Sequence, residues 1–165
     1  MFRNGLWILP PNYRFNFGMS TDTPITGDWD GDGVDTIGVR RGKQWILSNS
    51  NENPSVAYRV NWGEDTDIPV VGDWNDDGTD TIGVRRGRQW ILSNSNTAPV
   101  VAYRFNYGLS SDIPVVGDWN DDGVDTIGVR RGRQWILSNS NTAPVVAYRF
   151  NYGLSTDIPV TGNWI

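Results

Sequence analysis

The residues best suited to chemistry are carboxylates in a short acidic loop that occurs three times in the chain. The first copy begins at Asp28 and reads DWDGDGVD, and near copies begin at Asp73 and Asp118. Acidic or amide side chains stand at positions one, three and five, and glycine at position six allows a tight bend. The chain contains neither histidine nor cysteine, so this all-oxygen set suits calcium better than a transition metal. The sequence therefore predicts three calcium sites, because a fourth copy at Asn163 stops after its first residues.

Each predicted site draws on five positions of its loop. Positions one, three and five supply side chains, position seven a backbone carbonyl, and position eight a closing carboxylate. The predicted ligands are Asp28, Asp30, Asp32, Val34 and Asp35; Asp73, Asn75, Asp77, Thr79 and Asp80; and Asp118, Asn120, Asp122, Val124 and Asp125. The competing interpretation is a metal-free turn whose side chains cap its own backbone. Calcium is favoured over it because so many carboxylates within eight residues repel one another without a cation.

The spacing of the loops indicates a tandem repeat. Asp28, Asp73 and Asp118 follow one another at intervals of 45 residues, which defines repeats 28–72, 73–117 and 118–162. Each repeat holds four short segments rich in β-branched and aromatic residues, separated by glycine, proline, asparagine and aspartate. Four antiparallel strands in a unit of this length are typical of a β-propeller blade. The sequence therefore predicts an all-β fold.

The two ends of the chain match complementary parts of the repeat. Residues 1–27 resemble the later strands of one repeat and the first strand of the next, whereas residues 158–165 resemble only a first strand. We therefore expect a single domain, 1–165, that forms a four-bladed β-propeller. Its composite blade combines 1–27 with 158–165, and pairing of the N- and C-terminal segments closes the ring and removes exposed edges. A closed monomer is expected, and the alternative is an open array that completes an oligomeric ring.

The acidic loop and its flanking strands, as in GDWDGDGVDTIGV, resemble the integrin-type FG-GAP and VCBS repeats. The resemblance covers nearly the whole chain and implies propeller blades with a calcium loop between their first two strands. The family loop usually closes with aspartate at position nine, where this chain has Thr36, Thr81 and Thr126. We expect the aspartate at position eight to close each loop, with the threonine at position nine as the alternative.

Other repeated residues have both a structural and a ligand-binding interpretation. Trp45, Trp90 and Trp135 occupy the same position in successive repeats, where core packing is the usual role of an aromatic residue. The alternative is that they form stacking platforms for sugar rings. The two arginines of each tandem pair point to opposite faces of a strand, so one member of each pair is expected to pack against carboxylates. The pairs begin at Arg40, Arg85 and Arg130.

Composition restricts the class of function. The formal charge of −5 argues against nucleic acid as a partner, because phosphate binding requires a basic surface. No apolar run is long enough for membrane insertion. We expect no catalytic residues, because repeated loops offer only like groups, although a two-carboxylate glycosidase is an alternative. The expected function is a secreted or cell-surface module, with no signal sequence in this chain, that recognises glycans or a protein surface. A purely structural repeat is the competing class.

Overall fold

The computed structural model of the chain describes residues 1–9 and 13–162. All regular secondary structure in this part is β-strand, arranged as four antiparallel sheets. The all-β prediction is therefore confirmed. In the same residues there is no helix with the length and apolar character needed to cross a bilayer.

The sheets follow the order of the chain. The first sheet has three strands and the other three sheets have four, and each strand pairs with its sequence neighbour. The strands are β1 (Phe2–Arg3), β2 (Leu6–Leu9) and β3 (Tyr13–Asn16); β4 (Thr23–Gly27), β5 (Thr36–Arg41), β6 (Gln44–Leu47) and β7 (Tyr58–Asn61); β8 (Ile68–Gly72), β9 (Thr81–Arg86), β10 (Gln89–Leu92) and β11 (Tyr103–Asn106); and β12 (Ile113–Gly117), β13 (Thr126–Arg131), β14 (Gln134–Leu137) and β15 (Tyr148–Asn151).

Tight hairpins join the second and third strands of each four-stranded sheet. Arg86 pairs with Gln89 across a two-residue turn, and Gly87 in that turn has a φ of 59°. A left-handed conformation at the first turn residue matches the twist of the flanking strands, and glycine adopts it at no steric cost. The RRG sequence therefore sets the register of β9 against β10.

The apolar core lies between consecutive sheets. Trp45 and Leu47 of the second sheet pack with Ile82 and Val84 of the third. The same pattern recurs one repeat later, where Trp90 is in a cluster with residues of the fourth sheet. The second and third sheets therefore each bury one face against the sheet before and the other against the sheet after.

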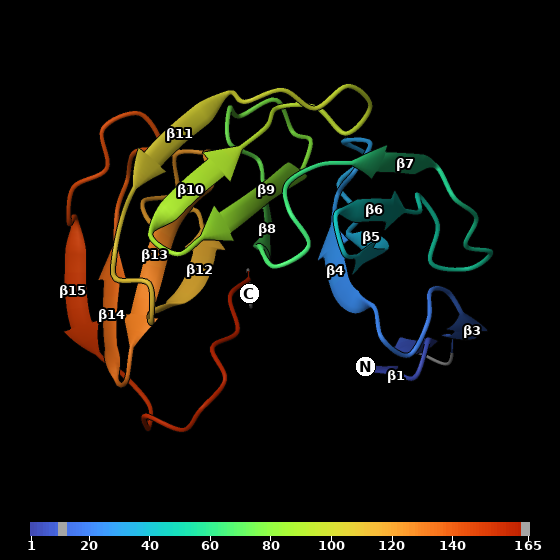
Figure 1. Cartoon of the computed structure of the whole chain (residues 1–165), viewed down its shortest axis with the longest axis horizontal. Helices are drawn as coiled ribbons and strands as arrows, with labels where there is room; N and C mark the ends of the chain where they lie inside the picture. Colours follow the sequence, from blue (N-terminus) through green and yellow to red (C-terminus); the bar gives the residue numbers. More distant parts are fainter. Residues whose placement is uncertain (10–12, 163–165) are drawn as a thin grey trace.

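The sheets are arranged in a row that curves around the middle of the molecule (Figure 1). The innermost strands β4, β8 and β12 contact one another in sequence. The first and last sheets lie at the two ends of this row, and the C-terminal segment returns from the last sheet toward the middle. The inner strands, each followed by an acidic loop, therefore bring the three loops to one region.

The C-terminal segment differs from the strand expected for it. Residues 158–162 form no strand, and Ile158 and Val160 are largely exposed. The remaining residues of the predicted composite blade, 10–12 and 163–165, lie outside the described residues. A physical reason for the difference is the length of β1, which has two residues where β5 has six and so offers an inner strand few hydrogen bonds.

Candidate metal centre

The first acidic loop brings three carboxylates together. Ligand oxygens of Asp28, Asp30 and Asp32 all lie within 4.8 Å of one another, and in the part of the chain that the structure describes no other group of this kind occurs. Asp28 is half-buried, whereas the other two side chains are exposed. The cluster is therefore open to solvent on one side, as a site that exchanges a cation must be.

The backbone of this loop folds around Asp28. Its Oδ1 accepts the Gly31 N–H at 2.8 Å and its Oδ2 accepts the Gly33 N–H at 2.7 Å. Both glycines have positive φ, 75° and 85°, which lets successive N–H groups point at one carboxylate. These bonds fix the first carboxylate without a cation, as the metal-free interpretation requires, but Asp30 receives no such bond in the described structure.

The second and third loops have the same backbone but a different arrangement at position three. Asn75 Nδ2 donates to Asp77 Oδ2 at 3.0 Å, and Asn120 Nδ2 donates to Asp122 Oδ2 at 2.8 Å. An amide can neutralise part of the repulsion between carboxylates by donating a hydrogen bond, whereas the carboxylate of Asp30 cannot donate. The first loop is therefore the strongest candidate for a cation, and the other two require the amide to turn.

The residues at position seven were predicted to supply carbonyl ligands. Their N–H groups donate to the position-five carboxylate, from Val34 to Asp32 at 2.9 Å and equally from Thr79 and Val124 in the other loops. This bond orients the fifth-position carboxylate. The three carboxylates of the first loop, all hard oxygen donors, fit a calcium ion.

Two of the aspartates at position eight, Asp80 and Asp125, join neighbouring sheets. Asp80 Oδ2 accepts the Asp28 N–H at 2.9 Å, and the Asp80 N–H donates to the Asp28 carbonyl at 2.7 Å. Asp125 makes the same pair of bonds to Asp73, at 3.1 and 2.7 Å. These carboxylates therefore bind the first residue of the preceding loop, which differs from the predicted closure of their own loops.

The threonines at position nine are also engaged elsewhere. Thr36 Oγ1 donates to the Ser48 carbonyl at 2.6 Å, and Thr81 Oγ1 donates to the Ser93 carbonyl at 2.8 Å. Both threonines are buried at the start of β5 and β9. Thr36 and Thr81 therefore connect the start of the second strand to the residue after the third, and all three position-nine hydroxyls also donate at 3.4 Å to the carbonyl that precedes their own acidic loop.

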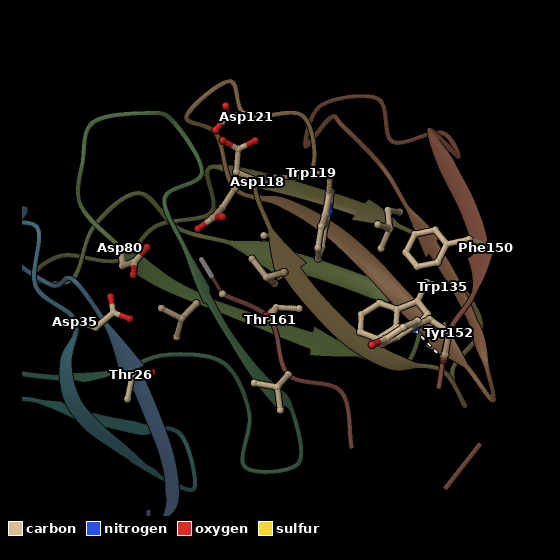
Figure 2. Close-up of a pocket in the computed structure, with 17 residues that line it drawn as sticks. Thr26, Asp35, Asp80, Asp118, Trp119, Asp121, Trp135, Phe150, Tyr152 and Thr161 are labelled. Carbon is tan, nitrogen blue, oxygen red and sulfur yellow. Dashed lines mark hydrogen bonds between the residues drawn. The ribbon is translucent and has the colours of Figure 1, made fainter. Parts of the chain in front are cut away.

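A cavity of about 960 Å³ lies where the inner strands meet. Asp35, Asp80 and Asp125 line it together with Thr161 of the C-terminal segment. Figure 2 shows Asp35 and Asp80 on one side of this cavity and the aromatic side chains of the last sheet on the other. The position-eight aspartates thus form an acidic centre distinct from the loop cluster.

Burial and mutual repulsion change the titration of these groups. Burial raises the pKa of Asp80 to about 7, with the charges of Asp125, Asp35 and Asp28 acting in the same direction. Burial also raises the pKa of Asp125 to about 6, and it raises that of Asp35. The folded protein therefore holds protons here that the unfolded chain releases at lower pH.

This proton uptake predicts how the Asp80→Asn variant responds to pH. The pKa of Asp80 is higher in the folded state, so its contribution to the free energy of unfolding falls as pH rises from about 4 to about 7. In EDTA, the Tm of Asp80→Asn should fall less over this range than that of the parent, because its amide is neutral throughout. The amide oxygen can still accept the Asp28 N–H, so the contact itself is kept. Asp65→Asn, on an exposed loop, is the control. Parallel Tm profiles for parent and Asp80→Asn would contradict the assignment.

The tryptophans proposed as sugar platforms have different surroundings in the structure. Trp45 and Trp90 are fully buried, and each indole N–H donates to a backbone carbonyl, at 3.1 Å for Trp45 and 3.3 Å for Trp90. They are core residues, which corrects the ligand-binding interpretation for these two. Trp135 is only half-buried, lines the central cavity and stacks on Phe150 (Figure 2).

The tandem arginines behave as expected and also reveal a role that sequence reasoning missed. The second member pairs with a buried carboxylate, as in Arg41 with Asp22 at 2.8 Å, which confirms that prediction. The first member, as in Arg85, is 1% exposed and lies 5.6 Å over the Trp90 ring. It donates to the carbonyls of Asp112 and Leu109, and the only signal in the sequence is that the RR pair recurs.

The described residues thus contain one carboxylate cluster in an exposed loop and two related loops in which the amide at position three donates to the carboxylate at position five. They also contain an acidic group at the central cavity, in which Asp80 and Asp125 are half-buried and Asp35 is exposed. No family model, curated protein or solved structure matches the chain.

Proposed function

We propose that the chain is a calcium-stabilised β-propeller that binds a glycan or a protein surface without transforming it. Support for the binding role comes from the repetition of exposed apolar side chains. Val100 and Val145 are 69% and 71% exposed at equivalent positions of successive repeats, in the loops before β11 and β15, and Val101 and Val146 beside them are 44% and 45% exposed. Equivalent surfaces on one rigid scaffold allow several weak contacts to act together.

Calcium belongs to this proposal as a structural ion. Asp28, Asp30 and Asp32 are the first candidates to hold it, and the second and third loops follow once Asn75 and Asn120 turn their amide oxygens inward. Bound calcium supplies positive charge that offsets the repulsion among the loop carboxylates. The proposal gives the ion no catalytic step, because the loops present copies of one group rather than an acid and a base with separated pKa values.

The fold in this proposal is a closed four-bladed ring formed by one chain. Support comes from the order of the sheets, from the contacts between consecutive inner strands, and from the match of the two chain ends to complementary parts of one repeat. A closed ring covers the exposed faces of the first and last sheets, which an open row leaves to solvent. The secreted or cell-surface location is part of the same proposal, since calcium is abundant outside the cell.

The test is binding to an array of immobilised glycans and insoluble polysaccharides in millimolar calcium. We expect the parent to bind and Val100→Asp to bind more weakly, because the charge disrupts one of the equivalent surfaces. Combining Val100→Asp with Val145→Asp should reduce binding by more than the product of the single effects, as avidity requires. Glu52→Gln, a change on an exposed loop, is the control.

Two outcomes contradict this function. Absence of binding to every glycan and to every candidate extracellular protein would favour a purely structural repeat. Polysaccharide turnover that persists in EDTA and is abolished by replacing one aspartate would favour an enzyme.

A further inference from the structure

A repeated ion pair fixes the start of each inner strand. Arg86 Nε lies 2.8 Å from Asp67 Oδ1, and its Nη2 lies 2.9 Å from Asp67 Oδ2. The pair is therefore bidentate, and the Asp67 side chain is fully buried. Pairs with the same Nε–Oδ1 distance and a fully buried aspartate are Arg41–Asp22 and Arg131–Asp112. Each pair joins the end of the second strand to the residue that precedes the first strand of the same sheet.

The C-terminal segment carries the acidic half of a fourth pair. Asp157 follows Asp112 by one repeat, and its Oδ2 accepts the Leu154 N–H at 2.8 Å, as Asp112 accepts the Leu109 N–H at 2.8 Å. The local turn that presents the carboxylate is thus already formed. Within the described residues, however, no arginine pairs with the Asp157 carboxylate, although Arg130 donates to the Asp157 backbone carbonyl at 2.5 Å, and the residue is exposed.

The N-terminal strand carries the basic half. In β1, Phe2 pairs with Trp7 and Arg3 pairs with Leu6, in the register by which Arg85 pairs with Trp90 and Arg86 with Gln89. Arg3 therefore occupies the place of Arg86. It is exposed and forms no ion pair in the part of the chain that the structure describes.

Apolar residues at the end of the chain are likewise exposed where their equivalents in earlier repeats are buried. Val160 is 65% exposed, whereas Val115 and Val70 at the equivalent position are 5% and 7% exposed. Tyr152 on the last sheet is 73% exposed, whereas Tyr107 is 7% exposed under the next sheet. Among the described residues, in turn, no strand pairs with the free edge of β1 in the first sheet.

We propose that the chain's own C-terminal segment, residues 157–162, docks beside β1 as the inner strand of the first sheet, with Arg3 bound to Asp157. The inference deepens the proposed closed ring and names the contact that closes it. It depends on neither calcium nor a ligand.

The register of the docked segment follows from the last complete sheet. Ile113 pairs with Arg130 and Pro114 with Val129, which places Ile158 opposite Phe2 and Pro159 opposite Met1. This ladder is short because β1 has only two residues. The ion pair and the apolar contacts therefore carry much of the closure, and substitution of either charged residue opens the ring.

Docking within one chain is favoured by tethering. The first sheet and the C-terminal segment up to residue 162 lie on the same side of the row of sheets, near its open side (Figure 1). A segment tethered to its own partner reaches an effective concentration on the order of millimolar, far above the protein concentration of a dilute solution. A second copy therefore competes poorly for the same contact.

The experiment is a charge swap made in the full chain, in calcium and again in EDTA. Arg3→Asp and Asp157→Arg should each lower the Tm by about 2–6 °C, which corresponds to one or two kcal/mol in a chain of this size. The double variant should recover part of the Tm lost in the single variants, because it restores the ion pair but not the bond from the Leu154 N–H to the Asp157 carboxylate. The amide hydrogens of Ile158 and of residues 160–162 should exchange about tenfold faster in each single variant. The matched control is Arg86→Asp with Asp67→Arg, a pair already formed in the structure, which sets the scale of this partial rescue because Asp67 Oδ2 likewise accepts the Glu64 N–H.

The outcomes separate the closure from the alternatives. Single variants that melt like the parent, with amides of the C-terminal segment unprotected in the parent itself, would overturn the proposal. If mixing the Arg3→Asp chain with the Asp157→Arg chain restores the Tm and light scattering reports a dimer, the contact forms between two copies and the intramolecular docking is wrong. If the charge swap gives the expected result but the calcium or glycan experiment does not, the closure is retained and only the proposed binding function is rejected.

Discussion

Millimolar calcium should raise the Tm of this protein by about 5–10 °C over its value in EDTA. A ligand present at 100 times its Kd adds about 2.7 kcal/mol per site to the free energy of unfolding. In a chain of this size, each kcal/mol of that free energy shifts the Tm by about 2–4 °C. The physical reason is the first loop, where three carboxylates lie within 4.8 Å of one another and repel in the absence of a cation. Thermal melts at fixed ionic strength, with magnesium as the control for unspecific screening, measure the effect.

The loops themselves supply a matched pair of variants. Asp30→Asn gives the first loop the residue that Asn75 and Asn120 provide in the other two, so its calcium-dependent shift should shrink while its Tm in EDTA rises. Asn75→Asp should do the reverse in the second loop. A Tm that is identical in calcium and EDTA would remove the structural ion from the proposed function. A shift that Asp30→Asn leaves unchanged would place the ion in the other loops.

The Trp90→Ala variant should lower the free energy of unfolding by about 3–5 kcal/mol, as replacement of a buried aromatic residue by alanine does. Trp90 is fully buried, packs with Ile127 and Val129 of the next sheet, and lies beneath the Arg85 guanidinium. Its removal leaves a cavity and also removes the indole ring over which the buried Arg85 guanidinium lies. Equilibrium urea unfolding followed by the remaining tryptophan fluorescence measures the loss.

Trp135 occupies the same position one repeat later and is the informative comparison. It is half-buried in the described structure and has no following sheet against its face. When the C-terminal segment docks, Met1 and Ile8 of the first sheet come to the places that Val129 and Ile136 hold against Trp90, so we expect Trp135→Ala to cost nearly as much. A cost below about 1 kcal/mol for Trp135→Ala beside a full cost for Trp90→Ala would indicate an open row of sheets.

Much of the fold follows from local signals in the sequence. The strands have β-branched and aromatic residues bounded by glycine and proline, and the RRG turn requires the positive φ that glycine provides, so the order and approximate limits of the strands could be predicted. The acidic loops could be located for the same reason, because their glycines and carboxylates act over a few neighbouring residues.

The burial of individual side chains could not be predicted in this way. Trp90 and Trp135 have nearly identical sequence neighbours, yet only Trp90 is fully buried. What differs is the presence of a further sheet, which is a property of the position in the row. The bond from Asp28 to Asp80 likewise joins residues 52 positions apart, longer than one repeat, so the loop that contains Asp80 gives no local indication of it.

The bonds of Asp80 to Asp28 and of Arg85 to the segment before the next sheet connect only adjacent sheets. Recombination between nearly identical stretches of a gene can therefore add or delete a whole 45-residue unit, the interval from Asp28 to Asp73, and leave every contact between neighbours intact. Variants of different copy number would then fold equally well in their interior and differ only in whether their two ends meet. Selection on copy number in such a lineage acts through the geometry of closure, and not through the stability of any one unit.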